Sequence, residues 1–266
     1  MNILDTIVKK KFKEVENLKN QYPIKVLETR ELFSASTFSM CNALKQNDAS
    51  GIIAEIKRMS PSQGVINQDV SIRKISRGYV LAGASALSVL TDFDFFGGCN
   101  DDLVQARTLN SCPILRKEFI IDEYQVIEAK SIGADAILLI AAVLDPKVII
   151  SLTQQAQRLG MEVLLEVHDE QELMANQESG ADMIGVNNRN LKTFEVSVNT
   201  SRQLVDKIPK EFIKISESGI DSVITVKELR ALGYHGFLMG QNFMKEQHPE
   251  KACTNFILEL RRFRAQ

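Results

Sequence analysis

The sequence from Gly51 onward alternates short apolar runs with longer amphipathic stretches. The runs are rich in β-branched residues and bounded by turn residues, which favours strands that are buried on both faces of a parallel sheet. They predict strands at residues 52–56, 86–90, 114–117, 136–140, 162–167, 183–186, 212–215 and 236–239. The stretches that follow the strands predict helices at residues 71–81, 101–109, 123–132, 146–159, 170–178, 200–207, 222–232 and 249–263.

This order of elements gives eight strand–helix units. A doubly wound sheet typically has about five or six strands and a glycine-rich turn after the first of them. The motif G-x-G-x-x-G does not occur in the sequence. We therefore expect an α/β fold of the (β/α)8 TIM-barrel type.

The first 47 residues have a different pattern, without the strand-then-helix order. Ile3, Ile7, Phe12, Val15 and Leu18 form an apolar stripe among lysines and glutamates, which predicts an amphipathic helix that ends before residue 23. A second helical or irregular piece follows over residues 26–44. We expect residues 1–47 to be a helical extension that packs on the barrel, and residues 48–266 to be the barrel domain.

Composition and charge exclude several classes of function. The 266 residues carry 32 basic and 34 acidic side chains, so the net charge does not favour binding to nucleic acid or to a membrane surface. The longest apolar run, residues 136–144, is too short to span a bilayer. Residues 1–19 lack the pattern of a secretory leader, and the cysteines lack metal-ligand spacing. We expect a cytoplasmic protein with reduced thiols and without a metal.

Charged and polar residues occur where the predicted strands end, and in a barrel the active site lies at those carboxyl ends. Side chains two apart on a strand point the same way, so Glu55 and Lys57 share a face. Lys117 and Glu166 are expected to face inward from the third and fifth strands and to flank a substrate across the apolar fourth strand. The other polar residues at these ends are Ser60, Asn187, Arg189 and Glu217.

The remaining strand ends predict two further parts of a site. The turns Ser218–Gly219 and Gly240–Gln241 follow the seventh and eighth strands, the usual place for a phosphate group in such barrels. Glycine there permits close approach of the backbone. A flat apolar slot for an aromatic ring is predicted from Phe96, Phe119, Leu138 and Ile140.

Taken singly, each of these features has an ordinary structural explanation. A lysine–glutamate pair at a strand end is commonly a solvated ion pair, and a glycine there is commonly a turn residue. We interpret His168, two residues beyond Glu166, as a structural loop histidine. The convergence of the other groups on one rim of the barrel favours a functional site.

The motifs at the strand ends resemble those of the indole-3-glycerol phosphate synthase family of the tryptophan pathway. The resemblance is carried by Ala54-Glu-Ile-Lys-Arg-Met-Ser-Pro-Ser62, Ser88-Val-Leu-Thr91, Arg116-Lys-Glu-Phe119, Glu166-Val-His168, Gly185-Val-Asn-Asn-Arg-Asn-Leu191 and Ser216-Glu-Ser-Gly219. It implies ring closure of 1-(2-carboxyphenylamino)-1-deoxyribulose 5-phosphate to indole-3-glycerol phosphate, with loss of CO2 and water and without a cofactor. It also implies a helical extension near the site. Association with other enzymes of the pathway is a further expectation from the resemblance.

The resemblance implies roles for individual residues. Lys117 is the general acid of ring closure and Glu166 acts in dehydration, although the division of acid–base roles between them and Lys57 stays open. Lys57 lies near the substrate's carboxylate and hydroxyl oxygens, and the residues that orient it are Glu55, Asn187 and Glu217. The phosphate is held by Ser218, Gly219 and Gly240. Other substrate contacts are Ser60, Pro61, Phe96, Phe119, Leu138, Ile140 and Arg189.

Two positions depart from the family pattern. Glu118 replaces an aspartate, and its side chain is expected to point away from the site. Gln241 stands where the family more often has Ser or Glu, so the side-chain part of the phosphate contact stays open.

Two alternatives belong to other classes of function. A sibling barrel, an isomerase that acts on phosphoribosylanthranilate, needs a Cys–Asp pair at strand ends, but Cys112 precedes the third strand. A non-catalytic phosphate-binding barrel is expected to lack Lys117 or Glu166, and both are present. The oligomeric state is left open.

Overall fold

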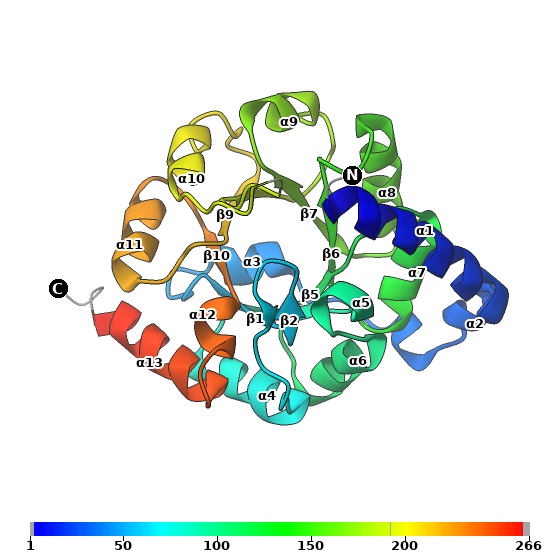
Figure 1. Cartoon of the computed structure of the whole chain (residues 1–266), viewed down its shortest axis with the longest axis horizontal. Coiled ribbons are helices and arrows are strands. Elements are labelled where there is room, and N and C mark those ends of the chain that lie inside the picture. The colour runs from blue at the N-terminus through cyan, green and yellow to red at the C-terminus, as the bar shows by residue number, and fades with distance from the viewer. Residues whose placement is uncertain (1–2, 192, 263–266) are drawn as a thin grey trace.

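The computed structural model of the chain describes residues 3–191 and 193–262. Within them, eight parallel strands close into a barrel in the order β1, β4, β5, β6, β7, β8, β9, β10 and back to β1 (Figure 1). The strands are β1 (Ile52–Ile56), β4 (Ala86–Leu90), β5 (Ile114–Lys117), β6 (Ala136–Ile140), β7 (Glu162–Val167), β8 (Met183–Asn187), β9 (Ile213–Glu217) and β10 (Gly236–Met239). The predicted (β/α)8 barrel is confirmed.

Helices follow the strands and surround the barrel (Figure 1). They are α4 (Ile72–Ala82), α6 (Asn100–Leu109), α7 (Glu123–Ser131), α8 (Pro146–Arg158), α9 (Glu170–Ala175), α10 (Asn199–Leu204), α11 (Val223–Ala231) and α13 (Pro249–Arg262). Local chemistry sets their ends: the Ser71 hydroxyl accepts a hydrogen bond from the Lys74 amide at the start of α4, and Gly83 ends that helix in the left-handed conformation. None of the helices in the described ranges is long and apolar enough to cross a membrane.

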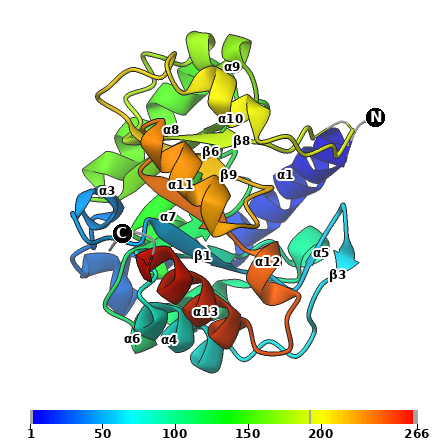
Figure 2. The ribbon, with the colours of Figure 1, turned by 90° about the vertical axis from the view of Figure 1, so that its left-hand side faces the viewer.

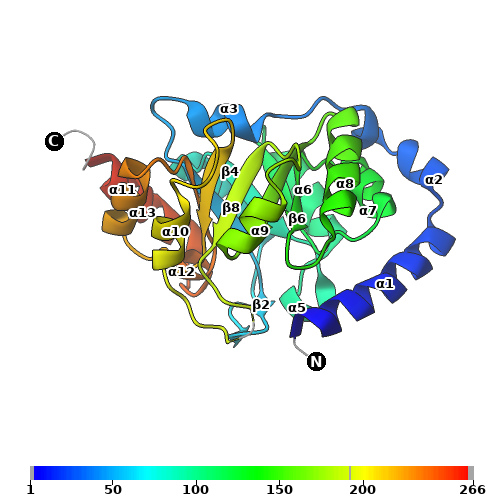
Figure 3. The same cartoon turned by 90° about the horizontal axis from the view of Figure 1, so that it is seen from above.

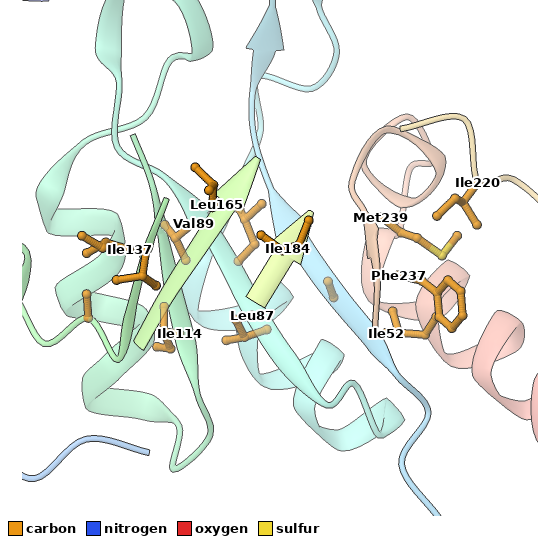
Figure 4. Packing of buried hydrophobic residues seen from close by; sticks show 14 of the residues in the cluster. Ile52, Leu87, Val89, Ile114, Ile137, Leu165, Ile184, Ile220, Phe237 and Met239 are labelled. Atoms are coloured by element: carbon orange, nitrogen blue, oxygen red, sulfur yellow. The ribbon is translucent and has the colours of Figure 1, made fainter. Parts of the chain in front are cut away.

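Alternation along each strand divides the core into two parts. The larger cluster lies between the strands and the surrounding helices, and includes Ile52, Leu87, Ile114 and Phe237 (Figure 4). The smaller cluster fills the barrel interior with the residues of opposite parity, namely Ile53, Ala86, Leu115, Ala136, Leu138, Ile140, Leu164, Met183, Ile213, Ile215 and Leu238. The same inward series continues, towards the carboxyl ends, with polar residues instead of apolar ones.

The chain before β1 forms α1 (Ile3–Gln21), α2 (Ile24–Glu28), the 3-10 helix η1 (Glu31–Ser34) and α3 (Met40–Lys45). Figures 2 and 3 show α3 at one end of the barrel and the N-terminal end of α1 at the other. Met40 and Leu44 of α3 join the interior cluster, and the Glu162 carboxylate accepts hydrogen bonds from the amides of Met40 and Cys41 at 2.7 and 3.0 Å. α3 therefore plugs the amino-terminal end, which leaves the carboxyl end for a site. The domain boundary after residue 47 stays a prediction.

The predicted apolar stripe of α1 is wrong at one position. Ile7 and Val15 are buried, but Phe12 is 59% exposed, and the side chain between them is Lys11, which is only 2% exposed. The Lys11 ammonium lies 3.0 Å from carboxylate oxygens of both Asp92 and Glu118. A buried lysine is tolerated because these carboxylates compensate its charge.

Some short elements were not predicted from the sequence. The loop after β1 contains an antiparallel pair, β2 (Met59–Ser60) and β3 (Gly64–Val65), and the loop after β4 contains helix α5 (Phe93–Phe96). A further short helix, α12 (Gln241–Met244), follows β10. Strands β8 and β9 also extend beyond their predicted ends, so Asn187 and Glu217 lie in strands rather than in loops.

Candidate active site

A cavity of about 190 Å³ opens at the carboxyl end of the barrel. Every residue predicted for the site lines it: Glu55, Lys57, Ser60, Pro61, Phe96, Lys117, Phe119, Leu138, Ile140, Glu166, Asn187, Arg189, Glu217, Ser218, Gly219, Gly240 and Gln241. Lining residues that the sequence pattern did not place there include Ile3, Leu4 and Ile7 of α1, as well as Glu118 and Phe194 from the loops after β5 and β8. The barrel and the first turns of α1 therefore enclose one common cavity.

Lys117 lies at the centre of the charged groups in this cavity. Its Nζ is 2.5 Å from Glu217 Oε2 and 3.1 Å from Glu166 Oε2. Lys117 and Glu166 enter the cavity from β5 and β7 with β6 between them, as expected, and the long lysine side chain reaches across β6 to contact Glu166 directly. That they flank a substrate stays a prediction. All three side chains are largely buried, so their mutual attraction is weakly screened by solvent.

Burial and charge shift the pKa values of these groups in different directions. Burial disfavours the charged form of Lys117, but Glu217 and Glu166 outweigh it and raise the pKa of Lys117 well above its usual range. Burial also works against ionised Glu166, yet Lys117 and His168 outweigh it, so the pKa of Glu166 is lowered. For Glu217 burial prevails with the help of the Glu166 carboxylate, and its pKa is raised although Lys117 opposes this.

Glu55 and Lys57 form a second pair on the wall of the cavity. The Lys57 Nζ lies 2.7 Å from Glu55 Oε1, and the Ser88 hydroxyl donates to Glu55 Oε2 at 3.3 Å. This confirms that Glu55 and Lys57 share a face. Burial would raise the pKa of Glu55, but Lys57 and Lys117 lower it. The pair therefore presents the Lys57 ammonium group to the cavity, and the Ser88 hydroxyl fixes its partner carboxylate on Glu55.

Two glycines leave room for these carboxylates. A Cβ on Gly185 would lie 2.3 Å from Glu217 Oε1, and a Cβ on Gly240 would lie 2.6 Å from Glu55 Oε1. Gly240 was expected to serve close approach of a phosphate, and the structure adds this second steric reason. Glu217 Oε1 is buried, and no described residue donates a hydrogen bond to it.

His168 was interpreted as a structural loop histidine, yet it contacts a site residue directly. Its Nε2 lies 3.2 Å from Glu166 Oε1, and its Nδ1 lies 3.1 Å from Glu172 Oε2. The sequence contained the necessary signal, because a residue two positions beyond Glu166 points to the same face of the strand. Glu118 also lines the cavity, but its carboxylate turns, as expected, to partners other than the central lysine, namely Lys11 and the Thr91 hydroxyl.

The turns predicted for a phosphate group meet at the rim of the cavity. Ser218 and Gly219 both have positive φ angles, 65° and 71°, and the Ser218 carbonyl accepts a hydrogen bond from the Asn188 side chain. Gly240 precedes the short helix α12, whose first residues Gln241 and Asn242 also line the cavity. Arg189 also lines the cavity, and its guanidinium donates to the Phe194 carbonyl at 3.1 Å.

The opposite side of the cavity is apolar. The rings of Phe96 and Phe119 lie with centroids 6.1 Å apart and interplanar angle 39°. Leu138 and Ile140 of β6 form the floor next to them, and Ile7 of α1 adds a third wall. The cavity thus combines an apolar slot, a charged centre and a rim of backbone amides.

A closed barrel that joins lysines and glutamates at the carboxyl ends of its strands is a (β/α)8-barrel enzyme with acid–base groups. Solved structures share this fold. One is the 3-hexulose-6-phosphate synthase from Salmonella typhimurium, at TM-score 0.61 and 15% identity over 79% of this chain and 99% of that one. Another is the thiamine phosphate pyrophosphorylase from Pyrococcus furiosus, at TM-score 0.58 and 15% identity over 84% and 99%.

Sequence comparison gives the family. The family model for indole-3-glycerol phosphate synthase matches residues 4–256. Indole-3-glycerol phosphate synthase of Bacteroides thetaiotaomicron is 47% identical over 96% of this chain and 98% of its own length. That of Polaromonas naphthalenivorans is 43% identical over 97% and 99%. The chain belongs to the indole-3-glycerol phosphate synthase family, whose members are carboxy-lyases of tryptophan biosynthesis that act on a phosphorylated small molecule.

Proposed function

We propose that Lys117 donates the proton to the substrate carbonyl when this enzyme closes the indole ring of 1-(2-carboxyphenylamino)-1-deoxyribulose 5-phosphate. Attack of the aromatic carbon on the carbonyl carbon forms the C–C bond and turns the carbonyl oxygen into an alkoxide, which needs a proton donor. The observation that carries the proposal is the place of the Lys117 ammonium, at the centre of the cavity and next to two carboxylates. Its raised pKa keeps it charged until a strongly basic oxygen forms beside it.

Glu166 is proposed as the proton acceptor of the later steps. CO2 leaves from the ring carbon that carried the carboxylate, and the electron pair of the broken bond returns to the ring system. Loss of the hydroxyl group as water then needs a donor for the oxygen and an acceptor for the ring proton. The lowered pKa of Glu166 supports an ionised carboxylate that can accept this proton.

Lys57 is proposed to hold the substrate carboxylate at the wall of the cavity. Among the described residues, Glu55 is the only hydrogen-bond partner of the Lys57 ammonium group, so its other two protons are available to a ligand. Asn187 and Glu217 face the same space from β8 and β9 and are proposed to orient the substrate. A division of the acid role between Lys57 and Lys117 stays open.

The phosphate group is proposed to lie at the rim formed by Ser218, Gly219 and Gly240. Support comes from their common place on the cavity wall and from the left-handed backbone at residues 218 and 219, which turns amides toward a ligand. Gln241 lines the same rim, so its side-chain amide can add one hydrogen bond. The aromatic ring of the substrate is proposed to pack against Phe96 and Phe119, whose rings contact each other.

A cytoplasmic location is a further proposal. It is supported by the cysteines of the described residues, all of which are free. Association with other enzymes of the tryptophan pathway is proposed only from the family.

The test is steady-state formation of the fluorescent indole product by three variants. Lys117→Met removes the proton donor, and Lys117→Arg keeps a charge between the carboxylates but cannot be deprotonated in a protein. We expect kcat to fall by about 10²–10⁴-fold in both. The matched control is Lys207→Met, because Lys207 is an exposed lysine that pairs with Glu170 away from the cavity. If a correctly folded Lys117→Arg enzyme keeps more than about a tenth of wild-type kcat, Lys117 is not the proton donor.

A further inference from the structure

The imidazole ring of His168 is held between two carboxylates from different elements. Glu166 belongs to the inward face of β7 and contacts Nε2 at 3.2 Å. Glu172 belongs to the first turn of α9 and contacts Nδ1 at 3.1 Å. The side chain of His168 is 12% exposed and that of Glu172 is 22% exposed, so the row of three groups runs from the buried site towards solvent.

Glu172 is fixed more firmly than an ordinary surface glutamate. The same oxygen that faces the imidazole, Oε2, also accepts the backbone amide of His168 at 2.8 Å. The backbone amide of Glu172 in turn donates to the capping carboxylate of Asp169 at 2.8 Å. The turn from β7 to α9 therefore sets the position of the imidazole through both its backbone and its ring.

The two contacts favour the protonated ring. Nδ1 makes a hydrogen bond to Glu172, whereas Nε2 lies at ion-pair distance from Glu166 Oε1 without a hydrogen bond of good geometry. An ionised carboxylate has no proton to donate, so a ring nitrogen beside one is more stable when it carries a proton. A neutral imidazole has a single N–H and would place a lone pair against one of the carboxylates. Burial alone would lower the pKa of His168, but Glu166 and Glu172 outweigh it and raise that pKa to about 10. His168 is therefore an imidazolium at neutral pH.

The Glu166 carboxylate is consequently bound by one cation on each oxygen. Lys117 of β5 contacts Oε2, and His168 contacts Oε1. The other groups that face this carboxylate are Asn187 of β8, which helps to lower its pKa, and Glu217 of β9, whose negative charge opposes it. The Lys117 ammonium is shared between Glu166 and Glu217. His168, by contrast, contacts only Glu166 among the carboxylates that line the cavity.

From this arrangement we infer that His168 is a positioning residue, which holds the Glu166 carboxylate in a single orientation and in its ionised form, and that Glu172 holds His168. The inference rests on the proposed role of Glu166 as proton acceptor. It differs from a structural role in one respect. A histidine that only closes the turn before α9 affects folding, whereas this one also sets the pH at which Glu166 loses its function.

The test compares His168→Gln, Glu172→Gln and the control Glu170→Gln by the pH dependence of kcat. Removing a neighbouring positive charge raises the pKa of a carboxylate by about one unit or more. We therefore expect His168→Gln to shift the acidic limb of the kcat profile upward by about one pH unit and to lower kcat at neutral pH by about tenfold, with KM changed less than about twofold. Glu172→Gln should shift the limb in the same direction by a smaller amount. Glu170→Gln, on the same helix but paired outward with Lys207, should leave it in place.

A lower melting temperature with an unshifted acidic limb would overturn the inference, and would leave His168 with a structural role. If His168→Gln does not fold, the milder Glu172→Gln decides by the same measurement. The single variant Glu166→Gln separates this inference from the proposed function. When Glu166→Gln is strongly impaired and the His168 and Glu172 variants are normal, only the inference fails; when Glu166→Gln is fully active, the proposed role of Glu166 fails first. In the Glu166→Gln background, His168→Gln should cause little further loss of kcat.

Discussion

The substitution Gly185→Ala tests how closely the Glu217 carboxylate must be positioned. Gly185 lies on the inward face of β8 and pairs with Ile215 of β9, and a Cβ there would approach Oε1 of Glu217, two residues further along β9, to 2.3 Å. The position does not require a left-handed backbone, so the substitution adds a methyl group without backbone strain. Steric contact with Glu217, and secondarily with Leu164 at 3.1 Å, is the whole perturbation.

The structure sets the size of the effect. Ordinary contact begins at 3.4 Å, so the carboxylate must retreat by about 1 Å. A displacement of that size at a site can cost about 10²-fold in rate, which corresponds to about 2.7 kcal/mol in the activation free energy. Overpacking costs about 1–3 kcal/mol of stability and is partly offset by the lower chain entropy of alanine, worth about 0.4–1 kcal/mol. We expect a folded enzyme with kcat reduced about 100-fold.

The assay is indole-product formation together with urea unfolding. Gly233→Ala is the control, because Gly233 has φ 109° and open space around its Cβ, so that variant should lose stability and keep its kcat. A second variant, Gly185→Ala with Glu217→Asp, removes one methylene from the displaced side chain. Its kcat should be no lower than that of Glu217→Asp alone. A Gly185→Ala enzyme within threefold of wild type would refute the reasoning that Glu217 needs its present position.

Three further predictions concern other parts of the molecule. Lys11→Met leaves the carboxylates of Asp92 and Glu118 buried without their cation, so it should lower the free energy of unfolding by about 3–5 kcal/mol. Phe12→Ser, on the exposed face of α1, should change that free energy by less than about 0.5 kcal/mol, and equal losses in urea titrations would contradict the burial of Lys11. In Gly219→Val the new Cβ would lie 2.4 Å from a Val196 side-chain atom, and valine would have to adopt φ 71°. Product affinity, measured by fluorescence titration, should therefore fall at least about tenfold, and unchanged affinity would place the phosphate elsewhere. The pKa of His168 is raised from 6.5 to about 10 in the folded state, so the stability that its charge provides is complete below pH 6.5 and is lost as the pH rises towards 10. The difference in unfolding free energy between wild type and His168→Gln should therefore shrink over that range, and a constant difference would exclude the imidazolium.

The barrel and the residues of its site were accessible from the sequence because both follow from local patterns. A short apolar run predicts a strand, and alternation then fixes which side chains point inward at its end. This reasoning placed Glu55, Lys57, Lys117 and Glu166 on one cavity wall. The same rule also puts His168 beside Glu166, although a lone histidine just after a strand carries no signal of its own for a site.

The contacts between elements were not accessible in this way. Helical periodicity in α1 allows either Lys11 or Phe12 beside Ile7 and Val15, and hydropathy favours Phe12. The structure selects Lys11, because Asp92 and Glu118, from the loops after β4 and β5, supply the compensating charges. Neither loop is near α1 in the sequence, so the choice depends on tertiary structure alone. The same holds for the direct contact between Lys117 and Glu166.

Glu166 and Glu217 show how far neighbours can separate two groups that the sequence presents as equivalent. Both are glutamates at the carboxyl ends of inward strand faces, both are buried, and both contact the Lys117 ammonium. Glu166 has the imidazolium of His168 on its second oxygen, whereas the second oxygen of Glu217 has no hydrogen-bond donor among the described residues. The pKa of Glu166 is lowered and that of Glu217 is raised as a consequence. Acid and base roles in an active site are assigned by pairs of groups whose pKa values are separated in this way. These opposite shifts support the proposal that Glu166 accepts a proton, and they make Glu217 the carboxyl group that is more readily protonated.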